Sequence, residues 1–283
     1  MEPAAHQAMP GRRYRGQSPD ERRAERRRRL VEAGLELFGT VGYAATSIEA
    51  VCSRAGVTAR HFYEHFDSRE ALMIAVFEEQ ATAVMREVVE ATEAEDPHDL
   101  DGRIRAGVGA FLRGVLGDPR RARVLSIESV GVSRDMERRR RSAMHAYARF
   151  VAGQIAAIAG VADSGADVDW LSLALVGGVN ELIVEWISGM FRPPVELLVT
   201  EVSAFFHAAG ELTIARWVAE GRLDRATAER LRRGRGGLPP PEVSHVEPTA
   251  PATAAAATPT TGTVPAATAA SAGRAPGGRR RGS

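Results

Sequence analysis

Apolar residues recur every three or four positions through most of the chain, which is the spacing of helices that bury one face. The first such segment opens with Ser18-Pro19-Asp20-Glu21, which combines an N-capping serine, a proline at the first helical position and a glutamate three residues after the cap. Its apolar positions run from Leu30 to Phe38, and Gly39 can end the helix. The pattern therefore predicts one long helix at the start of the ordered chain.

A second and shorter segment follows this helix. Thr46 is the predicted N-cap, Glu49 stands three residues later, and the apolar face includes Val51 and Cys52. The position of Cys52 on this face predicts a small buried core residue rather than a reactive thiol.

A turn separates the second segment from a third. Gly56 comes directly after the second apolar face, and Thr58 is the next predicted N-cap. The third helix can extend only over residues 59–66, because Asp67-Ser68-Arg69-Glu70 starts another capping box. A helix, a short turn with a central glycine and a second short helix form a helix-turn-helix arrangement.

The pattern stays helical beyond this arrangement. A long helix runs from the capping box up to Pro97. After Pro97 the apolar spacing predicts further helices over residues 99–117, 119–131, 134–160, 168–191 and 195–221. The last two are so apolar that we expect them to be buried on more than one side, in a core or in a subunit interface.

Composition changes this picture at both ends. All 37 Lys and Arg residues are arginine, and the first 29 residues contain a dense cluster of them. Residues 1–17 are therefore predicted to be a disordered basic arm. Proline, alanine, threonine and glycine dominate residues 235–283, which predicts a disordered Pro/Ala/Thr-rich tail. With a single cysteine, no secretory signal and no apolar run near the roughly 18 residues of a membrane span, we expect a cytoplasmic protein that does not bind membranes.

One pattern in the third helix is associated with metal chemistry. His61, Glu64 and His65 match the H-x-x-E-H pattern of one group of zinc peptidases, in which two histidines bind zinc and the glutamate activates water. Such a site needs a long, well-supported helix and a third protein ligand, whereas this helix has barely two turns. A zinc hydrolase is therefore a remote alternative, and we expect no catalytic residue, no metal and no cofactor.

A second interpretation assigns the same helix to DNA. Phe62 and Phe66, four residues apart, would anchor it to its neighbours. Arginine can bond a guanine edge through two hydrogen bonds, histidine can donate to an acceptor, alanine can touch a thymine methyl group, and tyrosine suits a phosphate oxygen. The outward residues that supply these groups are Ala59, Arg60, His61, Tyr63 and His65.

The motifs around this helix resemble the DNA-binding domain of the TetR family of bacterial transcriptional regulators. The resemblance covers residues 20–75 and departs from the family at three positions: Arg69, which is usually lysine, and Arg60 and His61, which are larger donors than usual. It rests on Gly42-Tyr43, Thr46-Ser47, Ala55-Gly56-Val57-Thr58, Tyr63-Glu64-His65-Phe66 and Ser68-Arg69-Glu70-Ala71-Leu72.

The resemblance implies an all-α fold, in which a three-helix helix-turn-helix DNA-binding domain precedes a larger helical domain for ligand binding and dimerisation. We therefore expect the DNA-binding domain over residues 18–66 and the effector-binding and dimerisation domain over residues 67–234. The expected DNA-binding residues are Thr46, Ser47, Thr58, Ala59, Arg60, His61, Tyr63, His65 and Arg69. The expected effector-binding residues are Met144, Tyr147, Trp170, Asn180, Glu181, Glu185 and Trp186.

The resemblance also implies a function. We expect a homodimeric repressor that binds a roughly palindromic operator in double-stranded DNA and leaves it when a small molecule occupies the larger domain. An apolar lining favours an apolar or aromatic effector, which would be cationic if a glutamate points inward. The alternatives are a ligand-independent activator or architectural DNA binder, an enzyme, and a protein–protein module that uses its helices only to dimerise.

Overall fold

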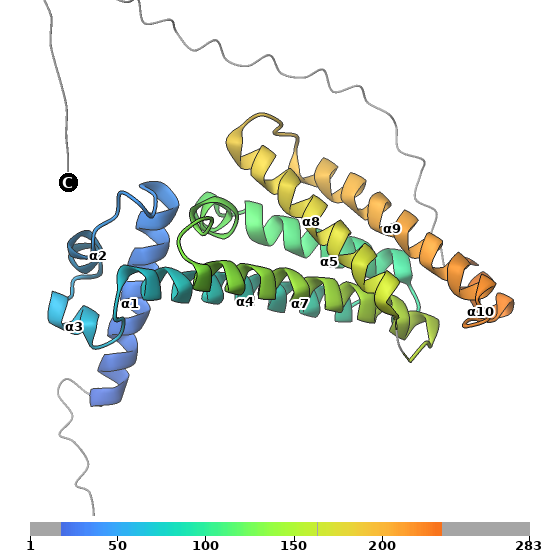
Figure 1. Cartoon of the computed structure of the whole chain (residues 1–283), viewed down its shortest axis with the longest axis horizontal. Coiled ribbons are helices and arrows are strands. Elements are labelled where there is room, and N and C mark those ends of the chain that lie inside the picture. The colour runs from blue at the N-terminus through green and yellow to red at the C-terminus, as the bar shows by residue number, and fades with distance from the viewer. Residues whose placement is uncertain (1–17, 163, 234–283) are drawn as a thin grey trace, which may run out of the picture. The chain divides into compact units, whose positions relative to one another are not determined.

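The computed structural model describes residues 18–162 and 164–233, and every regular element in these ranges is a helix (Figure 1). The predicted basic arm and the predicted Pro/Ala/Thr-rich tail lie outside the described residues. The helices are α1 Pro19–Thr40, α2 Ile48–Ala55, α3 Ala59–Tyr63, α4 Arg69–Glu93, α5 Leu100–Leu116, α6 Pro119–Arg123, the π-helix η1 Val124–Glu128, α7 Arg134–Ala159, α8 Ala166–Ser188, α9 Val195–Ala219 and α10 Arg225–Arg233. The prediction of an all-α fold is confirmed.

The start of α1 forms as its sequence predicts. The Ser18 hydroxyl accepts a hydrogen bond from the Glu21 amide at 3.1 Å, and the Glu21 carboxylate accepts one from the Ser18 amide at 2.6 Å. Two amides that a helix start would leave unpaired are thereby satisfied.

The predicted cap of α2 is wrong by one residue. Ser47, not Thr46, is the N-cap, and its hydroxyl accepts a hydrogen bond from the Ala50 amide at 3.2 Å. The Thr46 side chain is buried instead, and its hydroxyl donates to the Gly42 carbonyl at 2.7 Å.

The third helix is shorter than the predicted span and ends at Tyr63. Phe62 is fully buried and Phe66 is 5% exposed, so both anchor this segment as predicted. They pack into a cluster that joins α1, α2, α4, η1 and α7, and Cys52 belongs to the same cluster. Burial raises the pKa of the Cys52 thiol, which agrees with an unreactive core residue.

The other helices pack around two further apolar clusters. The central helix, α5, lies between α4 and α9, and α7 packs along α8. The short α10, which the apolar pattern did not predict, contacts α7 and α9. Near its middle this bundle leaves the cavities described below.

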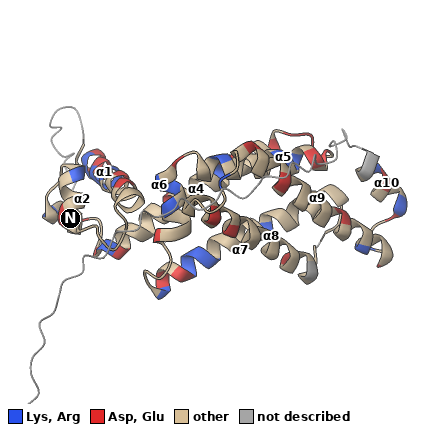
Figure 2. Cartoon of the chain, turned by 90° about the horizontal axis from the view of Figure 1, so that it is seen from above, with Lys and Arg blue, Asp and Glu red and all other residues tan. Residues whose placement is uncertain are grey.

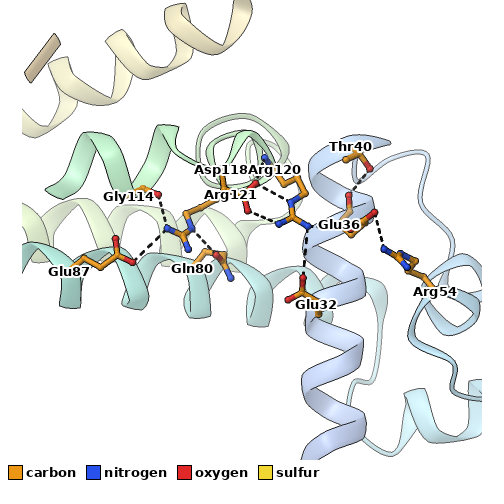
Figure 3. A network of polar contacts seen from close by, with 10 residues as sticks. All are labelled: Glu32, Glu36, Thr40, Arg54, Gln80, Glu87, Gly114, Asp118, Arg120 and Arg121. Atoms are coloured by element: carbon orange, nitrogen blue, oxygen red, sulfur yellow. Dashed lines mark hydrogen bonds and ion pairs between the residues drawn. The ribbon is translucent and has the colours of Figure 1, made fainter. Parts of the chain in front are cut away.

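A close junction joins α1 to α6. A Cβ atom on Gly39 would lie 2.6 Å from the Arg120 Cα and 2.8 Å from its carbonyl oxygen, so only glycine allows this approach. The Arg120 guanidinium ion-pairs with Asp118 at 2.8 Å and reaches Glu36 of α1 at 3.2 Å (Figure 3). Glu36 in turn pairs with Arg54 of α2 at 3.1 Å, so a chain of charges connects α6 with the helix-turn-helix.

The π-helix η1 makes a second connection beside the first. The Glu128 carboxylate accepts hydrogen bonds from the Tyr43 amide at 2.7 Å and from the Arg123 guanidinium at 2.8 Å. Arg123 also donates to the Thr40 carbonyl at 3.3 Å. Both the end of α1 and the loop that precedes α2 are therefore tied to η1.

Candidate nucleic-acid interface and ligand cavity

The turn between α2 and α3 is set by Gly56 and by an arginine of α1. Gly56 has φ 62°, in the left-handed region that favours glycine. The Arg29 guanidinium donates to the carbonyls of Ala55 and Gly56 and so satisfies groups that the end of α2 leaves open. This arrangement fixes the direction in which α3 leaves α2.

The outer face of α3 presents the predicted base and phosphate contacts to solvent. The Arg60 side chain is 88% exposed, Tyr63 is 56% exposed, and Ala59 and Thr58 are exposed as well. The Arg60 Nε lies 3.6 Å from the Glu64 carboxylate, an exposed pair that costs little to separate. This face can therefore offer a free guanidinium, a hydroxyl and a methyl group to a DNA groove.

Two of the other predicted contacts are helix caps near this face. The Ser47 and Thr58 hydroxyls are exposed while they cap α2 and α3. Partly exposed His61 places its Nδ1 3.1 Å from the Thr58 hydroxyl, so it belongs to the same surface.

Three predicted contacts have side chains that are turned toward the protein rather than fully exposed. Thr46 is buried, as described above. Arg69 donates to the Thr46 carbonyl at 2.6 Å and lies over the Tyr43 ring at 4.3 Å, so it secures the loop instead of facing a phosphate. The ring of His65 turns toward α1, where its Nε2 is buried without a hydrogen-bond partner among the described residues.

The surroundings of His65 also argue against zinc. Burial, and then the charges of Arg23 and Arg26, lower the pKa of its imidazole, so this is an electropositive site. His61 has its Nδ1 3.1 Å from the Thr58 hydroxyl at the surface, whereas the Nε2 of His65 is buried toward α1. Within residues 18–162 and 164–233, no cluster of three or more His, Cys, Asp or Glu side chains could hold a metal ion.

The arginines of α1 do not form a surface of one sign. Blue and red segments alternate along α1 in Figure 2, and Arg28 pairs with Glu25 at 2.7 Å. Arg26 lies 4.0 Å from the Glu64 carboxylate, and Arg23 donates to the Glu64 carbonyl at 3.4 Å. Part of the basic charge near α3 is therefore balanced within the protein.

An apolar cavity with a volume of about 100 Å³ lies among α4, α5, α7, α8 and α9. Its walls are almost entirely aliphatic and aromatic, and its polar side chains come from Thr92, Arg103, Tyr147 and Gln154. A second cavity of about 70 Å³ is lined by Tyr147, Met144 and Asn180, together with Leu125 and Ser126 of η1. A ligand in either space would touch helices that connect to the N-terminal bundle.

Four of the seven predicted effector residues lie away from both cavities. Trp170 is 76% exposed, and Glu181 and Glu185 face outward. The Trp186 indole donates to the Pro193 carbonyl at 3.0 Å and is covered by Arg192, so it closes a local turn. The structure thus places these four side chains outside the two cavities.

The cavity residues that sequence inspection missed are Thr92, Arg103 and Gln154. Arg103 stands in a helix with several charged residues, and only the tertiary packing distinguishes it from its exposed neighbour Arg105. No local signal in the sequence could have separated the two.

Comparison with known proteins covers mainly the N-terminal part of the chain. The sequence model of the "Bacterial regulatory proteins, tetR family" matches residues 30–76. The HTH-type transcriptional regulator YerO of Bacillus subtilis is 37% identical over 54 residues, which are 19% of this chain and 19% of that protein. The HTH-type transcriptional activator FasR of Mycolicibacterium smegmatis is 35% identical over 89 residues, 31% of this chain and 40% of its own, so the match spans less than half of either relative.

A structural comparison extends the likeness to the larger helical part. The transcriptional regulator FadR of Bacillus subtilis, solved in complex with stearoyl-CoA, superposes with a TM-score of 0.56 over 63% of this chain and 96% of its own. At 16% sequence identity this likeness concerns the fold alone. The match to the sequence model shows that residues 30–76 of this chain carry the N-terminal helix-turn-helix domain of the tetR family of bacterial regulatory proteins.

Proposed function

We propose that this protein is a sequence-specific transcriptional regulator that binds DNA as a homodimer and responds to a small molecule in its larger helical part. The observation that carries the proposal is the exposed outer face of α3, with Arg60 and Tyr63, within a tetR-family DNA-binding domain. Ala59 and Arg60 are assigned to base edges and Tyr63 to a phosphate, with Ser47, Thr58 and His61 at the margin. The regulator is proposed to bind its DNA in the cytoplasm.

Two-fold symmetry is the reason to propose a dimer. A palindromic operator presents the same groove twice, and two recognition helices must lie about one DNA turn, or a multiple of it, apart. Support comes from α9, where Phe205 and Leu212 are 58% and 54% exposed and stand seven residues apart, on one face of the helix. A second copy of this chain is the natural cover for such a face.

The response to a ligand is proposed to pass through α6 and η1. Leu125 and Ser126 line the second cavity, and Glu128 of the same π-helix holds the Tyr43 amide. A ligand that prefers one position of η1 would therefore favour one position of the helix-turn-helix, which lowers or raises DNA affinity by its differential binding to the two states. Repression released by the effector is the leading form of this proposal.

The first experiment is selection of DNA sequences by the full-length protein at low and moderate salt. We expect an inverted repeat, and we expect Arg60→Ala to change the selected bases while Tyr63→Phe weakens all sequences alike. Arg86→Ala, which removes an exposed arginine of α4, is the matched control and should leave the selected bases unchanged. Binding that depends steeply on salt without any preferred sequence would reduce the proposal to non-specific electrostatics.

One observation supports activation of transcription instead of repression. FasR, a relative over 31% of this chain, is named as an activator, so activation is the second candidate. A reporter gene placed behind the selected operator distinguishes the two, because loss of the regulator raises expression under repression and lowers it under activation.

A further inference from the structure

The charge of the proposed ligand can be inferred from the apolar cavity, which shares Phe111 and Tyr147 with the second cavity beside η1. Among the lining residues that the structure describes, Arg103 is the only one with a charged side chain, and the remaining walls are apolar apart from Thr92, Tyr147 and Gln154. Burial raises the pKa of the Tyr147 hydroxyl, so this group stays neutral. Any electrostatic preference of the cavity therefore comes from one guanidinium.

The partners of this guanidinium are neutral. Arg103 donates to the Gln154 amide oxygen at 2.5 Å and to the Glu95 backbone carbonyl at 3.4 Å, and its Nε is buried without a hydrogen-bond partner in the described chain. Arg113, ten residues further along the same helix, makes a two-bond pair with the Glu196 carboxylate at 2.7 and 2.8 Å. Among the described residues no carboxylate forms an ion pair with Arg103, so its positive charge lies beside an apolar cavity where a bound anion would be stabilised.

A second unsatisfied donor lines the same cavity. The Thr92 side chain lines the cavity, is only 2% exposed, and its hydroxyl has no partner among the residues described. Thr92 stands one turn before Glu95, whose carbonyl Arg103 contacts, so both groups lie near the end of α4. A Cβ atom on Gly107 would lie 2.7 Å from the Thr92 hydroxyl, so glycine at this position keeps the space around it open.

From this arrangement we infer that the cavity binds an amphipathic carboxylic acid, with its carboxylate on Arg103 and Thr92 and its hydrocarbon body among the apolar walls. A carboxylate accepts charge-assisted hydrogen bonds from a guanidinium and can take a further bond from a hydroxyl. Leu100, Ile104, Phe150 and Ile155 offer the chain an environment without competing polar groups. The ligand is therefore apolar over most of its length and carries a negative charge, not the positive one that an inward glutamate would have favoured.

The test compares two probes of the same shape, octanoate and octanamide, by calorimetric titration of the full-length protein. We expect octanoate to bind at least about tenfold more tightly than octanamide. The preference should fall to within about threefold in Arg103→Met and survive in Arg105→Met, whose arginine is exposed on the same helix. Arg103→Lys keeps the charge and should keep part of the preference, and circular dichroism establishes that each variant is folded.

Several results would overturn the assignment: equal binding of the two probes, an octanoate preference that survives in Arg103→Met, or no binding of octanoate. Should Arg103→Met fail to fold, the wild-type comparison and Arg103→Lys decide. The inference rests on the proposed function only for the ligand's role, which is measured separately as release of the selected operator. Arg103-dependent binding of octanoate without any effect on DNA affinity would uphold the ligand class and reject the effector role. Release by octanamide as well as by octanoate would uphold the effector role and reject the ligand class.

Discussion

Glu64 is the residue that organises charge next to the recognition helix. Its carboxylate lies 3.6 Å from the Arg60 Nε and 4.0 Å from the Arg26 guanidinium, and its carbonyl accepts a hydrogen bond from Arg23. In the unbound protein these contacts hold two arginines of α1 and one of α3 around one acid. In the proposed interface, DNA would compete with Glu64 for Arg60, and because this pair is exposed the competition would cost at most about 1 kcal/mol.

His65 gives the N-terminal bundle a predicted pH dependence. Its pKa is lowered from 6.5, first by burial and then by Arg23 and Arg26, while Glu64 acts in the opposite direction. The unfolded chain therefore binds a proton at a higher pH than the folded chain does. The contribution of His65 to the free energy of unfolding should therefore be complete above pH 6.5 and should decline as the pH falls below that value.

Urea denaturation of the wild type and of His65→Gln, at several pH values on both sides of this window, checks the prediction. The variant should lose most of the pH dependence, whereas His61→Gln, on the outer side of the same segment, should retain it. An unchanged slope in His65→Gln would assign the effect to another group.

At the scale of elements, the junction of α1 with α6 is the most sterically constrained contact. Gly39→Ala would place a methyl group 2.6 Å from the Arg120 Cα, where backbone must move to make room, and should lower the free energy of unfolding by about 1–3 kcal/mol. Gly153 in α7 has no atom within 4 Å of an added Cβ, so Gly153→Ala should instead gain about 0.5–1 kcal/mol from helix propensity. Denaturant titration of both variants measures the difference, and equal effects would contradict the tight junction.

Glu128 is predicted to stabilise the link between η1 and the helix-turn-helix. Its side chain is 13% exposed, and Glu128→Ala would leave the Tyr43 amide and the Arg123 guanidinium without their acceptor. We expect a loss of about 2 kcal/mol in the free energy of unfolding, because these are hydrogen bonds to a charged group. Glu90→Ala removes a carboxylate that is 69% exposed and should change stability by less than about 0.5 kcal/mol.

Helix boundaries could be predicted wherever a local cap decides them. Ser18 caps α1 through its own neighbours in sequence, and Ser68 caps α4 in the same way through the Ala71 amide. The start of α2 was misplaced because the choice between Thr46 and Ser47 depends on a contact with Gly42, outside the helix. The π-helix η1 likewise has no cap hydrogen bond from a side chain and lies where α1, α4 and α8 converge, so tertiary packing determines it.

The DNA-binding face and the ligand cavity also differ in how far the sequence predicts them. The exposed face of α3 could be predicted because Phe62 and Phe66 fix which side is buried. In α8 apolar residues surround the helix, so no stripe indicated that Trp170 and Glu181 face outward. Arg103 was missed for the converse reason, since a charged residue is ordinarily expected on a solvent-exposed face.

At the scale of the whole molecule, α8 and α9 stand out for the apolar surface that the single chain leaves uncovered. Both are long and apolar enough to cross a membrane by length and composition, and only 22% and 44% of their most apolar windows are buried. Burial against a second copy, as in the proposed homodimer, would give these helices the same properties. Most of α8 is drawn without charged residues in Figure 2, which agrees with such a role.

The proposed dimer makes a direct prediction for α9. Phe205→Glu combined with Leu212→Glu should convert the protein to a monomer in sedimentation experiments and weaken binding to a two-fold operator at least about tenfold, because two charges would have to be buried. Val130→Glu, at an equally exposed apolar position in the loop after η1, should stay dimeric. A variant of α9 that still sediments as a dimer would move the interface elsewhere.

The fit of Gly39 against Arg120 also limits how parts of such regulators can be exchanged. A hybrid that joined foreign N-terminal helices to this chain at residue 67 would set an unmatched α1 against the backbone of α6, and its loop would have to place a backbone amide within reach of Glu128. An exchanged segment would therefore have to include residues 39, 120 and 128 together. To change the operator, it is better to substitute only the solvent-facing side chains of α3. Such substitutions leave the contact between Gly39 and Arg120 unchanged and so preserve the proposed response to the ligand.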